Sequence, residues 1–125
     1  MIQRLSFWIM MIVCSVMVSG QEYDGYYTNP ILPSGADPWV VKHEGWYYYC
    51  CGVPGGIGVS RSRDLHKINP PVRVWKAPEK GQWNSTCIWA PELHFWKGKW
   101  YIFYAGGYSG PPFIHQKTGV LESVT

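Results

Sequence analysis

Short apolar and aromatic segments alternate with polar turns along the chain from about residue 36 onwards. The apolar segment Trp39-Val40-Val41 is followed by a polar turn at 42–45 and then by an aromatic segment that begins at Trp46. The same order returns around a second polar turn at 97–99. Segments rich in Trp, Tyr, Val, Ile and Phe that flank a glycine-containing turn are typical of antiparallel β-hairpins.

Each hairpin is followed by a further short segment with the same residue types. These segments are 57–60 after the first hairpin and 119–123 after the second. Beyond residue 20, no segment keeps the apolar spacing of three and four residues that an amphipathic helix requires. The pattern therefore predicts an all-β chain of antiparallel strands.

The two hairpins belong to an internal repeat. Residues 36–49 align with residues 90–103 at an offset of 54, which matches Ala36 with Ala90 and Trp46 with Trp100. Three or four antiparallel strands in roughly 50 residues is the size of one β-propeller blade. We therefore expect the first two blades of a β-propeller. Because a ring needs at least four blades, this interpretation makes the chain the front part of a longer protein. The alternative is a small two-sheet β domain with a chance repeat.

Residues 1–20 differ in character from the rest of the chain. A short basic region at Gln3-Arg4 precedes an almost wholly apolar run from Leu5 to Val18, and small residues follow. This is the pattern of a secretory signal peptide, and a run of about 14 residues is shorter than the roughly 20 needed to span a bilayer. We expect cleavage after residue 20 and a secreted product, extracellular or periplasmic, without further membrane contact. An uncleaved anchor is the alternative.

Composition and charge restrict the partners. Hydrophobic residues make up 46% of the chain and charged residues 15%, which is typical of a folded protein. The net charge is +3, and without residues 1–20 ten basic residues face eight acidic ones, which is too weak for nucleic-acid binding. Aromatic residues make up 17%, which suits both sheet packing and stacking on sugars. No pattern indicates a metal site or a phosphate loop, so no cofactor is expected.

Three cysteines follow residue 20, namely Cys50, Cys51 and Cys87. An oxidising compartment allows one disulfide between Cys87 and either of the other two. Only one of Cys50 and Cys51 can face inward, because adjacent strand residues point to opposite faces. Their spacing fits no zinc motif. Asn84-Ser85-Thr86 is an N-glycosylation sequon, which matters only in a eukaryotic host.

Three stretches carry a resemblance to a known family. They are Asn29–Leu32 with Gly35–Pro38, the connector Ser60–Leu65, and Ile88–His94 followed by Gly98–Ala105. Over nearly all of the chain after residue 27, the sequence resembles glycoside hydrolase family 43, and especially its branch of exo-acting α-L-arabinofuranosidases. The resemblance implies a secreted five-bladed β-propeller. It also implies a partner, an arabinose- or xylose-containing oligosaccharide or polysaccharide from plants.

The resemblance further implies that Asp37, in the motif Ala36-Asp37-Pro38, is the general base. A residue at the start of an innermost strand lies at the rim of a propeller's central funnel, and Gly35 and Ala36 leave room there for substrate. Pro38 is expected to hold Asp37 in an extended conformation. An ordinary Asp-Pro turn is the alternative. In the family the general acid and the aspartate that tunes its pKa lie on later blades, and no residue here matches either motif.

Three residues of the second repeat are candidates for substrate binding, namely Trp89, Glu92 and His94. Glu92 stands close to the position that Asp37 has in the first repeat, so we expect it to contact a sugar hydroxyl rather than to act as the acid. Trp89 offers a flat ring for a sugar, or packs in the core. His94 lies on the same strand face as Glu92, and a hydrogen-bonded core histidine is the alternative there.

The function expected from these features is inverting hydrolysis of an α-L-arabinofuranoside or a β-xyloside, in which Asp37 activates the attacking water. Without a match to the general acid, the chain is expected to be truncated. The alternative is a non-catalytic or vestigial secreted carbohydrate-binding protein.

Overall fold

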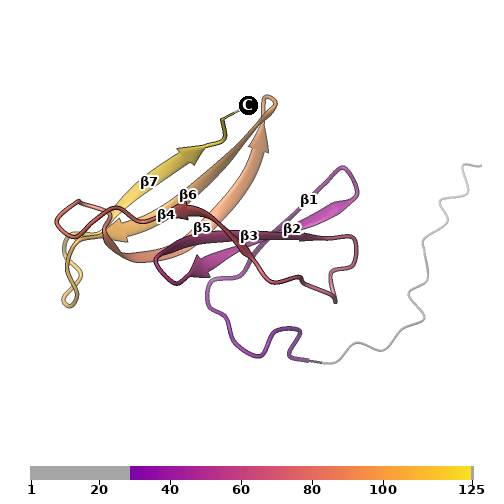
Figure 1. Ribbon diagram of the computed structural model, residues 1–125, viewed down its shortest axis with the longest axis horizontal. Coiled ribbons are helices and arrows are strands. Elements are labelled where there is room, and N and C mark those ends of the chain that lie inside the picture. Colours follow the sequence, from indigo (N-terminus) through magenta and orange to yellow (C-terminus); the bar gives the residue numbers. More distant parts are fainter. Residues whose placement is uncertain (1–28, 125) are drawn as a thin grey trace, which may run out of the picture.

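The computed structural model describes residues 29–124, which form seven β-strands in two antiparallel sheets (Figure 1). The all-β prediction is confirmed, whereas the signal peptide predicted at residues 1–20 lies outside the described residues. In the described part of the chain, no helix has the length and apolar character to cross a bilayer. The first sheet has the order β1-β2-β3-β4 and the second the order β5-β6-β7. The strands are β1 (Trp39–His43), β2 (Trp46–Val53), β3 (Gly56–Ser62), β4 (Val72–Lys76), β5 (Thr86–Trp96), β6 (Lys99–Gly107) and β7 (Lys117–Glu122).

Strand β4 is the element that the sequence pattern did not single out. It pairs with β3 at the edge of the first sheet, where Val72 and Val74 remain 71% and 55% exposed. Only Trp75 turns toward the core, opposite Ile57. A strand with one inward side chain gives a weak periodic signal, because its apolar residues do not separate into two clear faces.

The two hairpin turns explain why each sheet starts as it does. Glu44 and Gly45 have φ values of 48° and 75°, and Lys97 and Gly98 have values of 48° and 82°. Positive φ at both central residues is the geometry of a two-residue type I′ turn, whose twist matches that of the flanking strands. The predicted turns at 42–45 and 97–99 are therefore confirmed, each with a glycine at its second central position.

The register of the hairpins corrects the spacing of the repeat. The pair that closes the first turn is His43 with Trp46, and the pair that closes the second is Trp96 with Lys99, which is 53 residues further on. The offset of 54 predicted from sequence matched identical aromatic residues and is wrong by one position. A shift of one residue moves every side chain to the opposite face of a strand, so the correction changes which residues of the two blades are equivalent.

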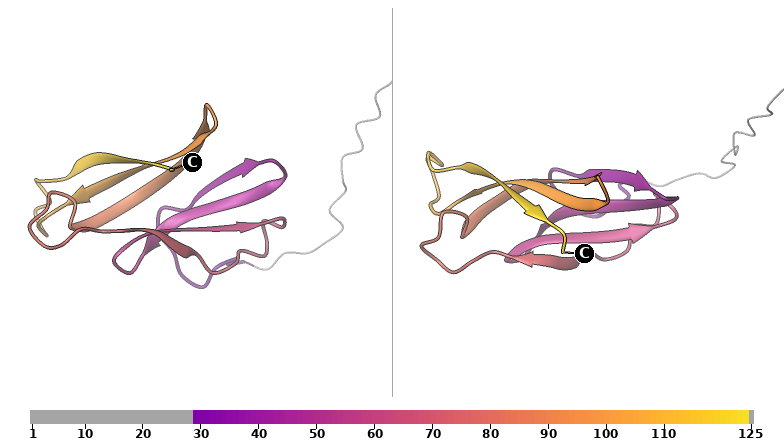
Figure 2. Two further views of the ribbon diagram at one scale, coloured as in Figure 1. Left: turned by 45° about the horizontal axis from the view of Figure 1, so that its top comes forward. Right: turned by 90° about the horizontal axis from the view of Figure 1, so that it is seen from above.

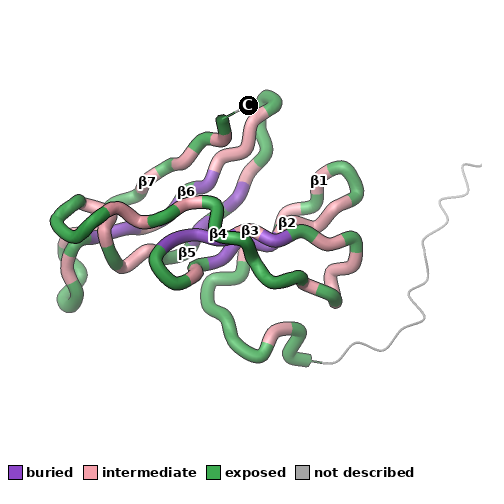
Figure 3. Tube along the Cα trace, in the orientation of Figure 1, coloured by how far each residue is buried: buried purple, intermediate pink, exposed green. Residues whose placement is uncertain are grey.

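The core lies between the two sheets, which pack against each other as two layers (Figure 2). Buried positions concentrate on β2, β3, β5 and β6 (Figure 3). The central cluster contains Cys50, Ile57, Leu93, Ile102 and Tyr104. The opposite face of the second sheet stays open, because Trp96, Phe103 and Val120 are 59%, 43% and 55% exposed.

Tyr104 of the second sheet packs against β4 of the first sheet and against the segment before β5. Its ring is 4% exposed and lies 5.0 Å from the ring of Trp75 and 6.2 Å from that of Trp83, between centroids. Its hydroxyl accepts a hydrogen bond of 2.7 Å from Nδ2 of Asn84. The amide nitrogen of the predicted sequon is thus engaged inside the protein.

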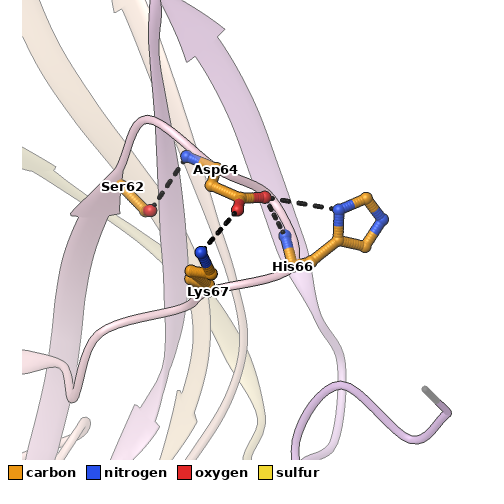
Figure 4. Close-up of polar contacts among 4 residues, drawn as sticks. All are labelled: Ser62, Asp64, His66 and Lys67. Atoms are coloured by element: carbon orange, nitrogen blue, oxygen red, sulfur yellow. Dashed lines mark hydrogen bonds and ion pairs between the residues drawn. The ribbon is translucent and has the colours of Figure 1, made fainter. Parts of the chain in front are cut away.

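The connector between β3 and β4 is a hydrogen-bonded turn (Figure 4). The Asp64 carboxylate accepts a 2.9 Å bond from the His66 backbone N–H, and the Asp64 N–H donates to the Ser62 hydroxyl at 3.0 Å. Lys67 Nζ lies 3.7 Å from the other carboxylate oxygen. The His66 backbone bond, followed by its side chain and Lys67, lowers the pKa of Asp64. The contacts of this connector are those of a solvated turn between two strands.

All three described cysteines are free thiols, so the disulfide that the sequence allowed does not form. Cys50 is fully buried in the core, whereas Cys87 is partly exposed at the start of β5. Burial, with a smaller contribution from Cys51, raises the pKa of the Cys50 thiol to about 12. Cys50 therefore behaves as a small apolar core residue.

Candidate active site

Asp37 lies directly before β1 and is exposed. Its φ is 49°, so the extended conformation predicted from Pro38 is wrong. A following proline disfavours the right-handed helical region, and the chain meets this restriction by placing Asp37 in the left-handed region, which Asp tolerates better than most residues. A non-glycine residue in this region is strained, and such strain is enriched at functional sites. Within the described residues, no hydrogen bond or ion pair engages its carboxylate.

The second blade begins with the same backbone feature. Ala90 has a φ of 45° and is followed by Pro91, as Asp37 is followed by Pro38. At the corrected offset of 53, Ala90 is the counterpart of Asp37. The second blade therefore places a methyl group where the first places a carboxylate.

Glu92 is consequently not in the position that the sequence suggested. It corresponds to Trp39, two residues further into the strand than the counterpart of Asp37. The mismatch arose because the repeat was aligned on identical residues, whereas the two turns at Glu44-Gly45 and Lys97-Gly98 fix an offset of 53.

Strands β1 and β5 run side by side in the same direction (Figure 1). The Trp39 indole Nε1 donates a 2.7 Å hydrogen bond to the Leu93 carbonyl, and the ring of His43 lies 4.0 Å from that of Phe95. From Trp39 to His43 along β1, the contacted residue on β5 changes from Leu93 to Phe95, so the two strands run in the same direction. Asp37, two residues before β1, and Trp89, near the beginning of β5, therefore lie at the same end of the two blades.

Trp89 lies partly at the surface. It is 40% exposed and forms a T-shaped contact with the ring of Phe113, with centroids 4.9 Å apart and planes at 69°. Phe113 lies in the segment between β6 and β7, which no sequence motif connected with the candidate residues. Its signal was the pairing of an aromatic residue with Pro111-Pro112, which fixes the backbone around it.

Glu92 and His94 lie on the same strand face, as predicted, and contact each other. Glu92 Oε2 is 3.5 Å from His94 Nε2, and the two side chains are 48% and 43% exposed. The imidazole packs between the rings of Trp39, at 5.1 Å, and Phe103, at 5.7 Å. His94 is therefore partly exposed and packed against aromatic rings.

The candidate residues thus form two groups at neighbouring positions on β5. In the first group Glu92 contacts His94, whose ring contacts that of Trp39. In the second, the Trp89 ring contacts Phe113 in the segment after β6. Asp37 is linked to the first group through the chain, two residues before Trp39. No group of three or more His, Cys, Asp or Glu side chains among residues 29–124 is arranged to hold a metal ion. The side chains available here are therefore the exposed carboxylate of Asp37 and, on β5, the Glu92–His94 pair and the exposed ring of Trp89.

The chain is similar in sequence to known proteins. The chain is 38% identical over 103 residues to alpha-L-arabinofuranosidase 43 of Humicola insolens, covering 78% of this chain and 21% of the relative. It is 37% identical over 86 residues to an extracellular exo-alpha-(1->5)-L-arabinofuranosidase of Streptomyces avermitilis, covering 65% of this chain and 18% of the relative. The chain therefore spans about a fifth of the length of these relatives.

Solved structures agree with the fold. The alpha-L-arabinofuranosidase of Lactobacillus brevis superposes with a TM-score of 0.67 at 32% identity, covering 77% of this chain and 33% of that one. A thermostable family-43 glycoside hydrolase gives 0.61 at 29% identity, covering 78% and 32%. The two sheets are thus two blades of a five-bladed β-propeller, as predicted. Residues 27–124 match the model of Glycosyl hydrolases family 43, and the chain belongs to that family.

Proposed function

We propose that this chain contributes the general base of a secreted glycosidase that hydrolyses terminal α-L-arabinofuranosyl units, or β-xylosyl units, with inversion. The observation that carries the proposal is the exposed carboxylate of Asp37, which has no hydrogen bond or ion pair within the described residues and lies two residues before β1 in a chain of family 43. The names of the relatives support the arabinofuranoside as the substrate class. Secretion through residues 1–20 agrees with two Streptomyces relatives that are named extracellular.

In this mechanism the Asp37 carboxylate removes a proton from a water molecule, which attacks the anomeric carbon opposite the leaving group. A carboxylate without an internal partner is free to accept that proton. The leaving oxygen needs a protonated acid roughly 6.5–9.5 Å from the base. We assign that acid to a carboxyl group outside residues 29–124, because Glu92 already contacts His94 and stands in the position of Trp39.

The remaining candidates bind the substrate. Trp89 supplies an apolar face for the sugar ring, and the Glu92 carboxylate accepts hydrogen bonds from sugar hydroxyls, supported by His94. Ala90 leaves space beside Trp89 where a longer side chain would project. The reacting sugar thus lies between a carboxylate from the first blade and an aromatic face from the second.

The test is Asp37→Asn in the protein expressed from the complete reading frame. Loss of a general base lowers kcat by about 10²- to 10⁴-fold, while the Kd for α-1,5-arabinotriose stays within about threefold of the wild-type value. The matched control is Glu44→Gln, whose side chain is 83% exposed at the opposite end of β1. Hydrolysis of methyl α-L-arabinofuranoside at wild-type rates by the Asp37→Asn protein would refute the base assignment.

A second candidate function is non-catalytic carbohydrate binding, which the exposed ring of Trp89 favours. It predicts arabinotriose binding without hydrolysis of any arabinofuranoside or xyloside. The same protein separates the two functions, because binding is followed by tryptophan emission and hydrolysis by released arabinose.

A further inference from the structure

The loop between β6 and β7 adds a second aromatic residue beside Trp89. Phe113 is 39% exposed and Trp89 is 40% exposed, so neither residue is buried in the core. Their planes meet at 69° with centroids 4.9 Å apart. Two exposed rings at this angle form an apolar corner. One ring comes from β5 and the other from the loop between β6 and β7.

The loop that carries Phe113 is held in place at both ends by Cys87. The Cys87 thiol donates to the Ser109 carbonyl at 3.5 Å, and Nε2 of Gln116 donates to the Cys87 carbonyl at 3.4 Å. Because Cys87 lies two residues before Trp89, the loop and the platform share one anchor.

Two further contacts close the loop on itself. Tyr108 and His115, near its two ends, stack with centroids 4.5 Å apart and planes at 20°. The Phe113 N–H donates a 3.1 Å hydrogen bond to the Gly110 carbonyl. Phe113 itself has a φ of 59°, which is unfavourable for a bulky residue and persists only where surroundings enforce it. The corner is therefore fixed before any ligand arrives, which lowers the entropic cost of binding.

We propose that Phe113 and Trp89 form a binding site for the sugar unit next to the one that is cleaved, in an arabinose-containing oligosaccharide. This inference rests on the proposed function, which puts the reacting sugar between Asp37 and Trp89. An oligosaccharide continues beyond the cleaved bond, and the C–H face of its next unit is the surface that an exposed aromatic corner accepts. Phe113 thus acts as a specificity-determining residue, which favours oligosaccharides over glycosides with a small leaving group.

The experiment compares two substrates in the protein from the complete reading frame. Phe113→Leu keeps an apolar side chain but removes the ring. It should lower kcat/KM for α-1,5-arabinotriose by about five- to tenfold, the size expected for one lost aromatic contact. For methyl α-L-arabinofuranoside, which lacks a second sugar, kcat/KM should stay within about twofold. Phe113→Tyr should restore the wild-type preference, and Ile114→Ala is the matched control, since Ile114 is 73% exposed in the same loop.

A binding measurement separates this inference from the proposed function. Arabinotriose is titrated against tryptophan emission, with wild-type and Phe113→Leu proteins. A five- to tenfold weaker Kd in the variant supports the site even if the wild type hydrolyses no arabinofuranoside, which would overturn only the proposed function. Equal losses on both substrates, or wild-type Kd and kcat/KM in Phe113→Leu, would overturn the Phe113 site while hydrolysis by the wild type still supported the enzyme.

Discussion

Gly119 in β7 offers a sharp test of the packing between the strands of the second sheet. It pairs with Tyr104, and a Cβ built at Gly119 would lie 2.5 Å from Cζ and 2.7 Å from Cε1 and the hydroxyl oxygen of that ring. Contacts below 3.0 Å require a neighbour to move. The ring cannot move cheaply, because Tyr104 is 4% exposed, lies against Trp75 and is bonded to Asn84.

Two effects of Gly119→Ala oppose each other. Its φ is not in the left-handed region, so Ala would stabilise by about 0.4–1 kcal/mol through the entropy of the unfolded chain. Overpacking against a fixed ring costs about 1–3 kcal/mol. The overlap with two ring atoms and the hydroxyl oxygen places this site toward the upper part of that range, so we expect a net loss of about 1–2 kcal/mol.

Urea unfolding followed by tryptophan emission measures this difference in the protein from the complete reading frame. Gly110→Ala is the matched control, because a Cβ there meets no atom within 4 Å and its φ is not positive. It should be neutral or slightly stabilising. In a Tyr104→Leu background, the cost of Gly119→Ala should shrink. A Gly119→Ala protein as stable as wild type, or a cost unchanged by Tyr104→Leu, would refute the packing argument.

Two further outcomes follow from the second sheet. The Lys99 ammonium, ahead of the Tyr101 hydroxyl, lowers the pKa of Glu122 below its ordinary value of 4.5 by hydrogen bonding, so the folded state gains stability that is present above pH 4.5 and is lost as the pH falls. Glu122→Gln should therefore be less stable than wild type at pH 7, and the two should converge in acid unfolding titrations; an unchanged difference at pH 3 would contradict this. Residues 21–125 alone should associate in sedimentation experiments, because Trp96, Phe103 and Val120 leave an apolar sheet face open. A cooperative, monomeric melt of that segment would disprove the expectation.

The sequence predicted the hairpins because their signals are local. The turns at Gly45 and Gly98 need residues that accept positive φ, and the flanking segments are rich in the aromatic and β-branched residues that strands favour. The family also followed from short motifs, such as the one around Asp37.

The alignment of the two blades could not be predicted in the same way. Aligning Trp46 with Trp100 matched identical residues. However, Trp46 lies directly after the first turn, whereas Trp100 lies one residue further from the second turn. Only the pairing of strands decides which face a residue occupies, and that pairing is set at the turns, which an alignment on identical aromatic residues does not record. The role of Glu92 was misplaced for this reason. The left-handed conformation of Asp37 and the anchored loop of Phe113 depend on contacts between distant segments, so they too emerge only in three dimensions.

The two blades share one backbone conformation, at Asp37 and at Ala90, but carry different side chains there. A left-handed residue ahead of a proline stands two residues before β1 and again within β5, and nothing in that backbone frame depends on whether the side chain is the carboxylate of Asp37 or the methyl of Ala90. A propeller built from such starts can exchange reactive and inert groups around its axis by single substitutions, while its strands keep their pairing. Repeated architecture of this kind lets new active sites arise without a new fold.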